Sequence, residues 1–498
     1  MSIIQVSDLT FSYDGSYVPI FEKVNFHMDT AWRLGLIGRN GRGKTTLLRL
    51  LLGELPYEGC IVSSVPFTYF PYPVKDPGQS AGALLERLCP GVADWEILRE
   101  LGLLRVEEGV LERPFEELSS GEQTKVLLAS MFLGEERFLL LDEPTNHLDA
   151  DARDAVADYL RRKKGFILVS HDRALLDGCT DHTLSINKAD IEVRKGNYST
   201  WREARDRQDQ YEQAEQDKLR GEVKRLEAAG RRNESWSDRL EATKYGSRNS
   251  GIRPDRGYIG HKSAKMMKRA KVIENRQQKA LEEAASLVKN WEREEPLKLH
   301  PLTHHAKTLL ELRQVTIDYA GVPVCGPLDL SIHGGDRIAL LGKNGSGKSS
   351  LLKLIQGEPL GHRGMMETAG GLILSYVPQD SRHLCGSLRG YAREQEVEET
   401  LFFTILRKLG FRREHLEQEL SDLSDGQKKK VLIARSLCQS AHLYLWDEPL
   451  NFMDIPSRLQ IEALILAHKP TLLFVEHDVA FCLAIATKQV RLDGPQDA

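Results

Sequence analysis

The chain carries the stretch GRNGRGKT at Gly38–Thr45 and repeats it as GKNGSGKS at Gly342–Ser349. Both fit the pattern G-x-x-x-x-G-K-[ST], whose glycines let backbone N–H groups turn inward around phosphate oxygens, while the lysine reaches the terminal phosphates and the hydroxyl reaches a magnesium ion. Each stretch follows an apolar run, Leu34–Ile37 or Ile338–Leu341, and precedes an apolar helical segment. Strand, loop and helix in this order are the context that the motif requires. The sequence therefore predicts two phosphate-binding loops.

Composition is typical of a soluble globular protein with two or three domains: 498 residues, 41% hydrophobic and 28% charged. No apolar stretch approaches the roughly 18 residues needed to span a bilayer, and the N-terminus lacks a signal pattern. We therefore expect a cytoplasmic protein that does not associate with membranes. The seven cysteines form no C-x-x-C pair, which predicts neither a zinc site nor a disulfide framework.

The similarity of the two stretches extends to whole domains, because five pairs of landmarks are separated by 304 to 306 residues: Tyr13 and Tyr319, Lys44 and Lys348, Gly121 and Gly426, Glu143 and Glu448, His171 and His477. We therefore predict two copies of one α/β domain, at residues 1–198 and 306–498, with a connector at residues 199–305. Short, continuous apolar runs alternate with helical patterns in each copy, which favours a buried parallel sheet.

The connector is expected to form two long helices around a turn. Mostly apolar residues in the second helix, with one glutamine among them, recur at alternating spacings of three and four, as in the seam of an antiparallel coiled coil: Ala270, Ile273, Gln277, Ala280, Ala284, Leu287 and Trp291. The first helix has a weaker stripe: Trp201, Tyr211, Leu219, Val223 and Leu226. Tyr245–Gly260, rich in turn-forming residues, would be the tip. An arm of about thirty residues would project about 45 Å.

Charge is distributed unevenly along the chain. The net charge is −4, yet the segment from Arg231 to Lys271 contains twelve Lys and Arg residues against four Asp and Glu. Such a segment indicates a local site for a polyanion, although a solvated pair of helices is an alternative explanation. The basic residues that are candidates to contact this polyanion are Arg231, Arg232, Lys262, Lys265, Lys268, Arg269 and Lys271.

An apolar run in each copy ends in two acids, Asp142-Glu143 and Asp447-Glu448. The first acid can hold magnesium and the second can act as general base toward the attacking water. Acid pairs at strand ends are often structural, but their recurrence about a hundred residues after each phosphate loop favours a catalytic role. His171 and His477, each after a further apolar run, are candidate sensors of the γ-phosphate.

Each copy also contains a serine and a glycine at the start of a predicted helix, in the stretches LSSGEQ (Leu118–Gln123) and LSDGQ (Leu423–Gln427). Serine caps the helix and glycine permits close backbone approach, so the helix N-terminus can bind an anion. If the copies face each other head to tail, this end of one copy closes over the phosphates held by the loop of the other.

The phosphate loop, the Ser-Gly helix, the Asp-Glu pair and the histidine, in this order and twice over, resemble ATP-binding cassette ATPases. Two cassettes on one chain with a helical connector, and the stretch DEPTNHLD at Asp142–Asp149, resemble the ABC-F family, whose members act on ribosomes. The long tip, the stretch Met267–Arg269 and the absence of a sizeable extension after the second cassette are similar to the antibiotic-resistance branch, which protects ribosomes from lincosamides, pleuromutilins and streptogramin A.

The resemblance implies a Mg²⁺-dependent ATPase with Glu143, Glu448, His171 and His477 as catalytic residues. The implied magnesium ligands are Thr45, Asp142, Ser349, Gln379 and Asp447. Tyr13 and Tyr319 would stack on adenine. The full set of implied nucleotide-binding residues is Tyr13, Gly38, Asn40, Gly41, Arg42, Gly43, Lys44, Thr45, Thr46, Ser119, Gly121, Tyr319, Gly342, Asn344, Gly345, Ser346, Gly347, Lys348, Ser349, Ser350, Ser424 and Gly426.

The chain departs from the family pattern at several positions. Tyr72 replaces, in the first copy, the glutamine found as Gln379 in the second. Ser120 and Asp425 replace a usual signature glycine, and Asn451–Asp454 differs from Asn146–Asp149. We therefore expect unequal sites, of which the first holds magnesium less well, although both general-base glutamates remain.

The resemblance also implies the partners, which are the ribosome, through large-subunit ribosomal RNA and transfer RNA, and no membrane. The chain would be a monomer whose two cassettes pair with each other. The tip, around Ile252, Tyr258 and Ile259, would enter the ribosome near the transfer-RNA exit site and displace drug directly or through RNA. Three alternatives stay open, namely a housekeeping translation factor of the same family, a transporter ATPase and a DNA-bound ATPase.

Overall fold

The computed structural model describes residues 2–13, 19–134, 136–146, 148–187, 190–242, 261, 264–265, 267–268, 271–276, 278–279, 296–319 and 322–492. Contacts between residues divide the chain into two units. The first unit comprises Met1–Ile186, Asp190–Ser199 and Glu294–Ala498, and the second comprises Asn187–Ala189 and Thr200–Arg293. Both repeated domains therefore belong to the first unit. No helix among the described residues is long and apolar enough to cross a bilayer.

The first domain is built on a twisted core sheet with the strand order β5-β6-β7-β3-β8-β9. Its strands are β5 (Phe67–Phe70), β6 (Phe138–Asp142), β7 (Phe166–Val169), β3 (Arg33–Ile37), β8 (His182–Ile186) and β9 (Ile191–Lys195). Neighbouring strands are parallel except β9, which runs antiparallel to β8. The core of this sheet is parallel, as predicted, and β9 adds an antiparallel strand at one edge. The connection between β8 and β9 is short, and such a connection joins antiparallel strands.

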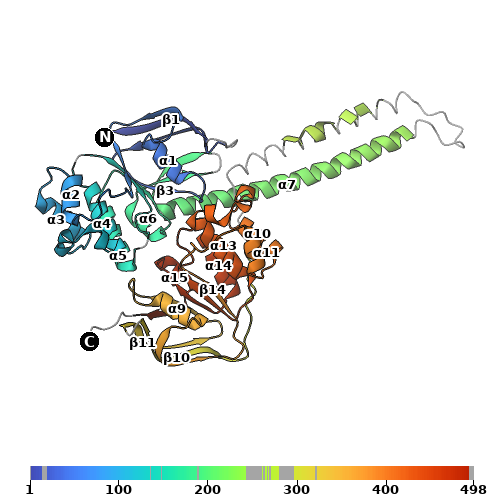
Figure 1. Cartoon of the computed structure of the whole chain (residues 1–498). Coiled ribbons are helices and arrows are strands. Elements are labelled where there is room, and N and C mark those ends of the chain that lie inside the picture. The colour runs from blue at the N-terminus through green and yellow to red at the C-terminus, as the bar shows by residue number, and fades with distance from the viewer. Residues whose placement is uncertain are drawn as a thin grey trace, which may run out of the picture. The chain divides into compact units, whose positions relative to one another are not determined.

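A second, antiparallel sheet of the first domain contains β2 (Phe21–Asp29), β1 (Ile3–Phe11) and β4 (Glu58–Val62). The helices are α1 (Lys44–Leu51), α2 (Ala81–Leu88), α3 (Asp94–Leu103), α4 (Ser120–Met131), α5 (Ala150–Arg161) and α6 (Arg173–Cys179). Helix α1 lies beside the antiparallel sheet, whereas α2 to α5 lie together on the other side of the domain (Figure 1).

The second domain repeats this plan. Its core sheet has the parallel order β14 (Leu374–Val377), β15 (Leu443–Asp447), β16 (Leu472–Val475), β12 (Arg337–Leu341) and β17 (Lys488–Arg491). Its antiparallel sheet contains β11 (Val322–His333), β10 (Thr308–Tyr319) and β13 (Gly361–Thr368). Its helices are α9 (Lys348–Gln356), α10 (Leu388–Glu394), α11 (Glu399–Lys408), α12 (Arg413–Leu416), α13 (Asp425–Cys438), α14 (Ile455–His468) and α15 (Val479–Ile485).

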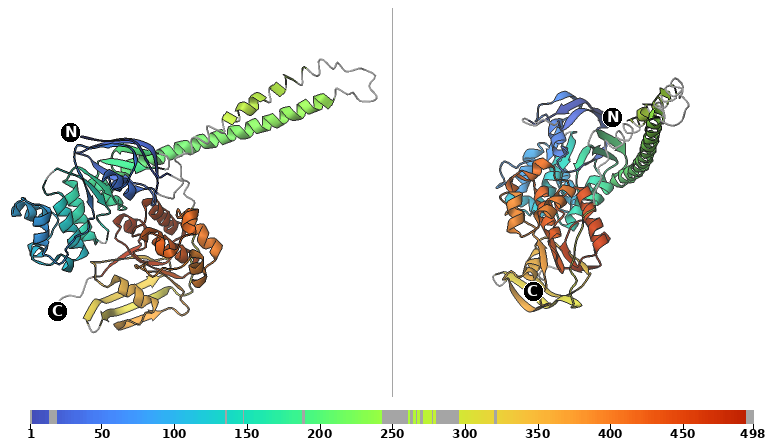
Figure 2. Two further views of the ribbon diagram at one scale, coloured as in Figure 1. Left: turned by 45° about the horizontal axis from the view of Figure 1, so that its top comes forward. Right: turned by 90° about the vertical axis from the view of Figure 1, so that its right-hand side faces the viewer.

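Successive side chains of a strand point to opposite faces of its sheet, and both faces of each core sheet are covered by other elements. On β12, Ile338 and Leu340 pack with α9 and the antiparallel sheet, whereas Ala339 packs with the helices of the other face. The antiparallel sheet and the helices α10, α11, α13 and α14 accordingly lie at opposite ends of the second domain (Figure 2). Burial on both faces explains why these strands are continuous apolar runs in the sequence.

The connector begins with a helix of 45 residues, α7 (Tyr198–Ala242). Residues 261, 264–265, 267–268, 271–276 and 278–279 are also helical. The antiparallel coiled coil stays a prediction, because most of its proposed seam (Ala270, Gln277, Ala280, Ala284, Leu287 and Trp291) lies outside the described residues. The tip residues Ile252, Tyr258 and Ile259 also lie outside them, as do Lys262 and Arg269.

Candidate nucleotide-binding sites

The phosphate loops require glycine for two different reasons. Gly43 and Gly347 precede α1 and α9 in the left-handed region, with φ of 91° and 83°. A Cβ at Gly43 would lie 2.6 Å from Ile20 Cγ2, and one at Gly347 would lie 2.5 Å from Cys325 Cβ. Conformation and space therefore both exclude a side chain there. Each glycine directs the loop into the helix N-terminus, where unpaired N–H groups and the helix dipole favour an anion.

The loop lysines are buried and held by their own loops. Lys44 Nζ donates to Gly38 O at 2.8 Å and to Asn40 Oδ1 at 3.2 Å. Lys348 Nζ donates to the backbone oxygens of Gly342 at 2.9 Å and Lys343 at 2.8 Å. Burial lowers the pKa of both ammonium groups. A phosphate group offers each lysine a full negative charge in place of these carbonyl oxygens, which favours its binding.

The second site fits a magnesium ion on the evidence of its carboxylate. Asp447, at the end of β15, is fully buried, and among the described residues only the Ser349 side chain interacts with its carboxylate, without the geometry of a full hydrogen bond. Burial, together with the neighbouring Glu448, raises the pKa of Asp447 to about 6. A divalent cation coordinated by oxygen would compensate this buried carboxylate. Ser349 and Gln379 line the adjacent cavity and supply further oxygen atoms.

The corresponding carboxylate of the first site already has two hydroxyl partners. Asp142 Oδ2 accepts hydrogen bonds from Thr45 Oγ1 at 2.9 Å and from Tyr69 Oη at 3.1 Å. Tyr72, which stands where the second copy has Gln379, instead places its hydroxyl 2.7 Å from Ser130 Oγ in α4. The first site therefore offers magnesium a carboxylate and a threonine, with Tyr69 competing for one carboxylate oxygen.

The two general-base candidates occupy equivalent positions, but the pKa values of their carboxyl groups are shifted in opposite directions. Both have positive φ, 51° for Glu143 and 47° for Glu448, a conformation that is uncommon outside glycine and concentrates at functional sites. Burial raises the pKa of Glu143 to about 7, although Lys44 opposes this shift. Burial acts in the same direction on Glu448, but hydrogen bonds from His477 and Gln379 outweigh it and lower the pKa to about 2.

Each histidine lies against the glutamate of its own copy. His171 Nε2 is 3.4 Å from Glu143 Oε1, and His477 Nε2 is 3.2 Å from Glu448 Oε1. Burial, followed by the charge of Lys44, lowers the pKa of His171 well below its usual value. A neutral imidazole at this position can hydrogen-bond both the glutamate and a phosphate oxygen.

The tyrosines before each phosphate loop are positioned alike. Tyr13 Oη lies 3.1 Å from Thr46 Oγ1, and Tyr319 Oη lies 3.1 Å from Ser350 Oγ. Each tyrosine is 44% exposed. A hydroxyl fixed on the loop helix and a partly exposed ring are suited to stacking on a base.

The signature helices carry reciprocal caps. On α4, the Ser119 hydroxyl accepts a hydrogen bond from Glu122 N, and the Glu122 carboxylate accepts one from Ser119 N. On α13, Ser424 and Gln427 form the same pair of bonds. A capping box satisfies two of the N-terminal donors and leaves the others directed outward.

Structure brings each signature helix to the phosphate loop of the other copy. A cavity of about 320 Å³ is lined by Ser120 and Arg153 of the first domain together with residues of the second: Val324, Asn344, Gly345, Gly347, Lys348, Ser349, Ser350, Gln379, Glu448, Asn451 and His477. At the other site, a Cβ on Gly426 would lie 2.9 Å from Asn40 Nδ2. Both sites thus combine the two domains head to tail.

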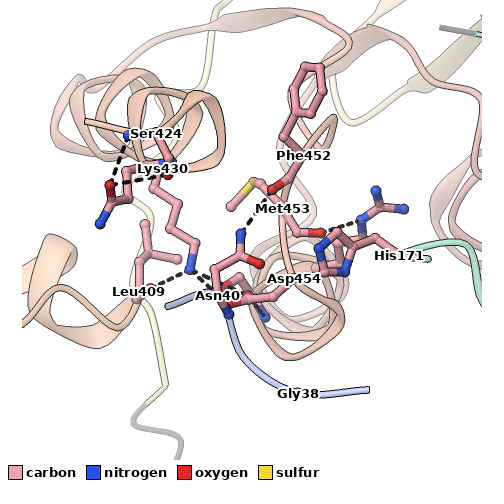
Figure 3. A network of polar contacts seen from close by, with 12 residues as sticks. Gly38, Asn40, His171, Leu409, Ser424, Lys430, Phe452, Met453 and Asp454 are labelled. Carbon is pink, nitrogen blue, oxygen red and sulfur yellow. Dashed lines mark hydrogen bonds and ion pairs between the residues drawn. The ribbon is translucent and has the colours of Figure 1, made fainter. Parts of the chain in front are cut away.

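Asp454 seals the contact at the first phosphate loop (Figure 3). Its Oδ2 accepts from Asn40 N at 3.0 Å, and Asn40 Nδ2 donates to Phe452 O at 2.9 Å. Lys430 Nζ, on the signature helix, is 3.1 Å from Asp454 Oδ2 and donates to Leu409 O at 2.8 Å. Burial would raise the pKa of Asp454, but Lys430 and the hydrogen bonds from Ser457 and Asn40 hold it far below its usual value. Lys430 and Asp454 were not among the residues predicted from sequence as site residues.

Another contact between the domains, Arg173 Nη2 to Glu462 Oε2 at 3.0 Å, also escaped the sequence analysis. The available signal in the sequence was that Arg173 follows His171 by two positions, where the second copy has Val479. Of the proposed RNA contacts, Arg232, Lys265, Lys268 and Lys271 are exposed, and Arg231 lies in α7.

Comparisons with known proteins agree with this geometry. The sequence profile of the family described as ABC transporter matches residues 21–146 and 325–451, together just over half of the chain. The chain is 28% identical over 488 residues to the ribosome protection protein VmlR of Bacillus subtilis, covering 94% of this chain and 83% of that protein. It is 27% identical over 500 residues to the ATP-binding protein Uup of Caulobacter vibrioides, covering 96% of this chain and 75% of that protein.

A further relative is the ABC transporter F family member 2 of Arabidopsis thaliana, 25% identical over 550 residues and covering 99% of this chain and 76% of that protein. Among solved structures, a chain in the complex of archaeal ribosomal stalk protein aP1 with the archaeal ribosome recycling factor aABCE1 matches with a TM-score of 0.62 at 19% identity. The match covers 98% of this chain and 87% of that chain. These relatives confirm the resemblance to the ABC-F group. The chain belongs to the ABC transporter family, as an ATP-hydrolysing protein with two ATP-binding cassettes on one polypeptide.

Proposed function

We propose that this protein is a ribosome-binding ATPase that protects the ribosome from antibiotics acting at the peptidyl-transferase centre. The observation that carries the proposal is the similarity to a ribosome protection protein over 94% of the chain. A match of that length includes the connector as well as both cassettes, so the similarity is not confined to the ATPase motifs. The protein would work in the cytoplasm as a monomer whose cassettes pair with each other.

Two ATP molecules would bind in the two composite sites and draw the cassettes together. Lys44 and Lys348 exchange their carbonyl partners for phosphate oxygens, while Ser119 and Ser424 approach from the opposite cassette. Magnesium, held at Asp142 and Asp447, would neutralise phosphate charge in the transition state. Glu143 and Glu448 would orient water and accept its proton as the water oxygen attacks the γ-phosphorus, while the bond to the β–γ bridging oxygen breaks and ADP is the leaving group. Loss of the γ-phosphate would then reopen the pair.

The connector, residues 199–305, would carry this cycle to the ribosome. As an antiparallel coiled coil it would place its tip near the transfer-RNA exit site and the peptidyl-transferase centre. The exposed Arg232, Lys265, Lys268 and Lys271 would meet phosphates of ribosomal or transfer RNA. Such contacts release counterions, so binding would weaken steeply with salt.

Drug susceptibility of cells that express the protein tests this proposal. Expression should raise the inhibitory concentration of at least one lincosamide, pleuromutilin or streptogramin A, but not that of a drug acting on the cell wall. The Glu143→Gln/Glu448→Gln variant should hydrolyse ATP about 10²- to 10⁴-fold more slowly and sediment with ribosomes in ATP but not in ADP. Unchanged susceptibility to all three drug groups would reject the protective function.

A housekeeping translation factor is the second candidate. Relatives whose names mention no protection, such as Uup at 27% identity, are nearly as similar as VmlR at 28%. This candidate predicts the same ATP-dependent ribosome binding without any change in drug susceptibility. Failure of the double Gln variant to sediment with ribosomes would contradict both candidates.

A further inference from the structure

Helix α6 is attached to the hydrolysis site at its N-terminal end. It begins two residues after His171, and Asp172 caps it by accepting from Leu175 N at 3.1 Å. His171 in turn lies 3.4 Å from Glu143. A histidine that moves when a γ-phosphate is bound or lost therefore pulls directly on the start of this seven-residue helix.

The other half of α6 holds the start of the connector. The Asp177 carboxylate accepts from Ser199 N at 2.6 Å and from Ser199 Oγ at 2.5 Å. Asn197 Nδ2 adds a bond to Asp177 O at 3.3 Å. Ser199 is the second residue of α7, whose first N–H groups have no partner within their own helix. A carboxylate at this end is a favourable cap and counters the helix dipole.

The same helix also contacts the opposite cassette. Arg173 pairs with Glu462 of α14 at 3.0 Å and lies 3.9 Å from Asp478. The side chains of Arg173 and Glu462 are only 15% and 18% exposed. Charges that are largely withdrawn from water couple more strongly than surface pairs. Helix α6 is thus linked to three places: to Glu143 through His171, to the facing cassette through Arg173, and to Ser199 at the start of α7 through Asp177.

The duplication provides an internal comparison. The equivalent helix of the second cassette, α15, follows His477 and has Val479 and Leu483 at the positions of Arg173 and Asp177. These two side chains are 55% and 69% exposed. The polar attachments are therefore specific to the copy whose last strand continues into the connector.

We propose that Asp177 is a positioning residue that couples the nucleotide state of the first site to the orientation of the connector helix. This proposal rests on the proposed function, in which the connector responds to ATP. A helix of 45 residues is about 67 Å long, so a tilt of about 5° at Ser199 would move its far end by about 6 Å. Small movements of α6 are thereby enlarged along α7.

Fluorescence transfer within the full-length chain tests the proposal without ribosomes. The two exposed cysteines, Cys60 and Cys385, are replaced by serine. Donor and acceptor dyes are then attached through Ile3→Cys and Tyr211→Cys, at sites that are 60% and 68% exposed. The Glu143→Gln/Glu448→Gln background keeps ATP bound, so that transfer efficiency can be compared with and without ATP.

ATP should change the transfer efficiency in the parent. Asp177→Ala should reduce this change about threefold or more, because it removes the charged cap from the first turn of α7. Affinity for ATP should change by less than about twofold, because the hydrogen bonds of Asp177 among the described residues go to Asn197 and Ser199, which are not nucleotide-binding residues. Asp177→Asn, which keeps an acceptor oxygen, should be intermediate, and Ser199→Ala should give a partial loss if Asp177→Ala proves unstable. Leu483→Ala is the matched control and should retain the full change.

A full ATP-induced change in both Asp177→Ala and Ser199→Ala would overturn the proposal, as would a parent that does not respond to ATP. Ribosome co-sedimentation separates this result from the proposed function. A parent that responds to ATP through Asp177 but does not bind ribosomes would support the coupling and refute the ribosomal role. If the parent binds ribosomes but the Asp177→Ala and Ser199→Ala variants keep the full ATP response, the ribosomal role would be supported and the coupling refuted.

Discussion

The two candidate general bases should give different pH profiles when each is left to work alone, one that rises with pH and one that is flat. In Glu448→Gln the remaining base is Glu143, whose pKa burial raises to about 7. In Glu143→Gln it is Glu448, whose pKa hydrogen bonds from His477 and Gln379 lower to about 2 despite its burial. A general base acts in its ionised form, so activity that depends on Glu143 is lost as the pH falls through about 7.

The size of the difference follows from the ionised fractions. A carboxyl group with a pKa of about 7 is about 9% ionised at pH 6 and about 91% at pH 8, so the activity should rise about tenfold between them. A group with a pKa of about 2 is fully ionised at both values, and its contribution should not change. The quantity to measure is kcat/KM, because it reports the ionisation of the free enzyme.

Phosphate release at limiting ATP and excess Mg²⁺ provides the assay, at pH 6, 7 and 8. Titration of the nucleotide itself affects both single variants equally and cancels in their ratio. The Glu448→Gln variant should therefore lose about tenfold more activity than Glu143→Gln on going from pH 8 to pH 6. Parallel profiles would show that the environments of the two glutamates do not differ as described.

Three further changes follow from the same structure. In the Glu448→Gln background, Tyr72→Gln should lower the Mg²⁺ concentration for half-maximal hydrolysis about fivefold, the equivalent of one added oxygen contact of about 1 kcal/mol; no change would mean that Tyr72 does not limit magnesium binding. Lys430→Ala leaves the buried Asp454 carboxylate without its ion-pair partner and should lower the free energy of unfolding, measured with denaturant, by about 3 to 5 kcal/mol. The equivalent change in the first copy, Lys125→Ala, affects a half-buried lysine and should cost about 1 kcal/mol or less. Equal losses would contradict the buried pair. Replacing Lys265, Lys268 and Lys271 by Gln should make the slope of log K for ribosome binding against log salt shallower by about 2 to 3, and an unchanged slope would remove these residues from the RNA interface.

The features predicted correctly from sequence are those with local causes. The phosphate loops depend on glycine conformations within a few residues, and a serine at the start of a helix acts as a cap regardless of distant packing. The continuous apolar strands also follow directly from burial on both faces of a sheet. Duplication strengthened each of these predictions, since an accidental pattern does not recur at a fixed offset.

The contacts that escaped prediction join segments far apart in the sequence. Arg173 and Glu462 are 289 positions apart, and Asn40 and Asp454 are 414 apart. Each is a common residue type without a motif, so nothing local marks it. For Asp177, comparison of the two copies at equivalent positions was the available signal, because a polar residue in one stands where the other has an exposed leucine.

The tyrosines near the first site illustrate a different difficulty. The sequence identified Tyr72 as a departure from the pattern, but Tyr69 is the tyrosine whose hydroxyl reaches Asp142. Tyr69 lies within β5, whereas Tyr72 lies beyond the end of that strand, and only one of the two, Tyr69, faces the Asp142 carboxylate. Which one does so depends on how β5 pairs with β6, and this register is not visible in the sequence.

The central claim is that each nucleotide is held between the phosphate loop of one cassette and the signature helix of the other. The most direct test is the structure of the Glu143→Gln/Glu448→Gln variant with ATP and Mg²⁺ bound. We expect Ser424 within hydrogen-bond distance of the triphosphate at Lys44, and Ser119 within the same distance of the triphosphate at Lys348. Two triphosphates that each contact only the cassette whose loop binds them would contradict the claim.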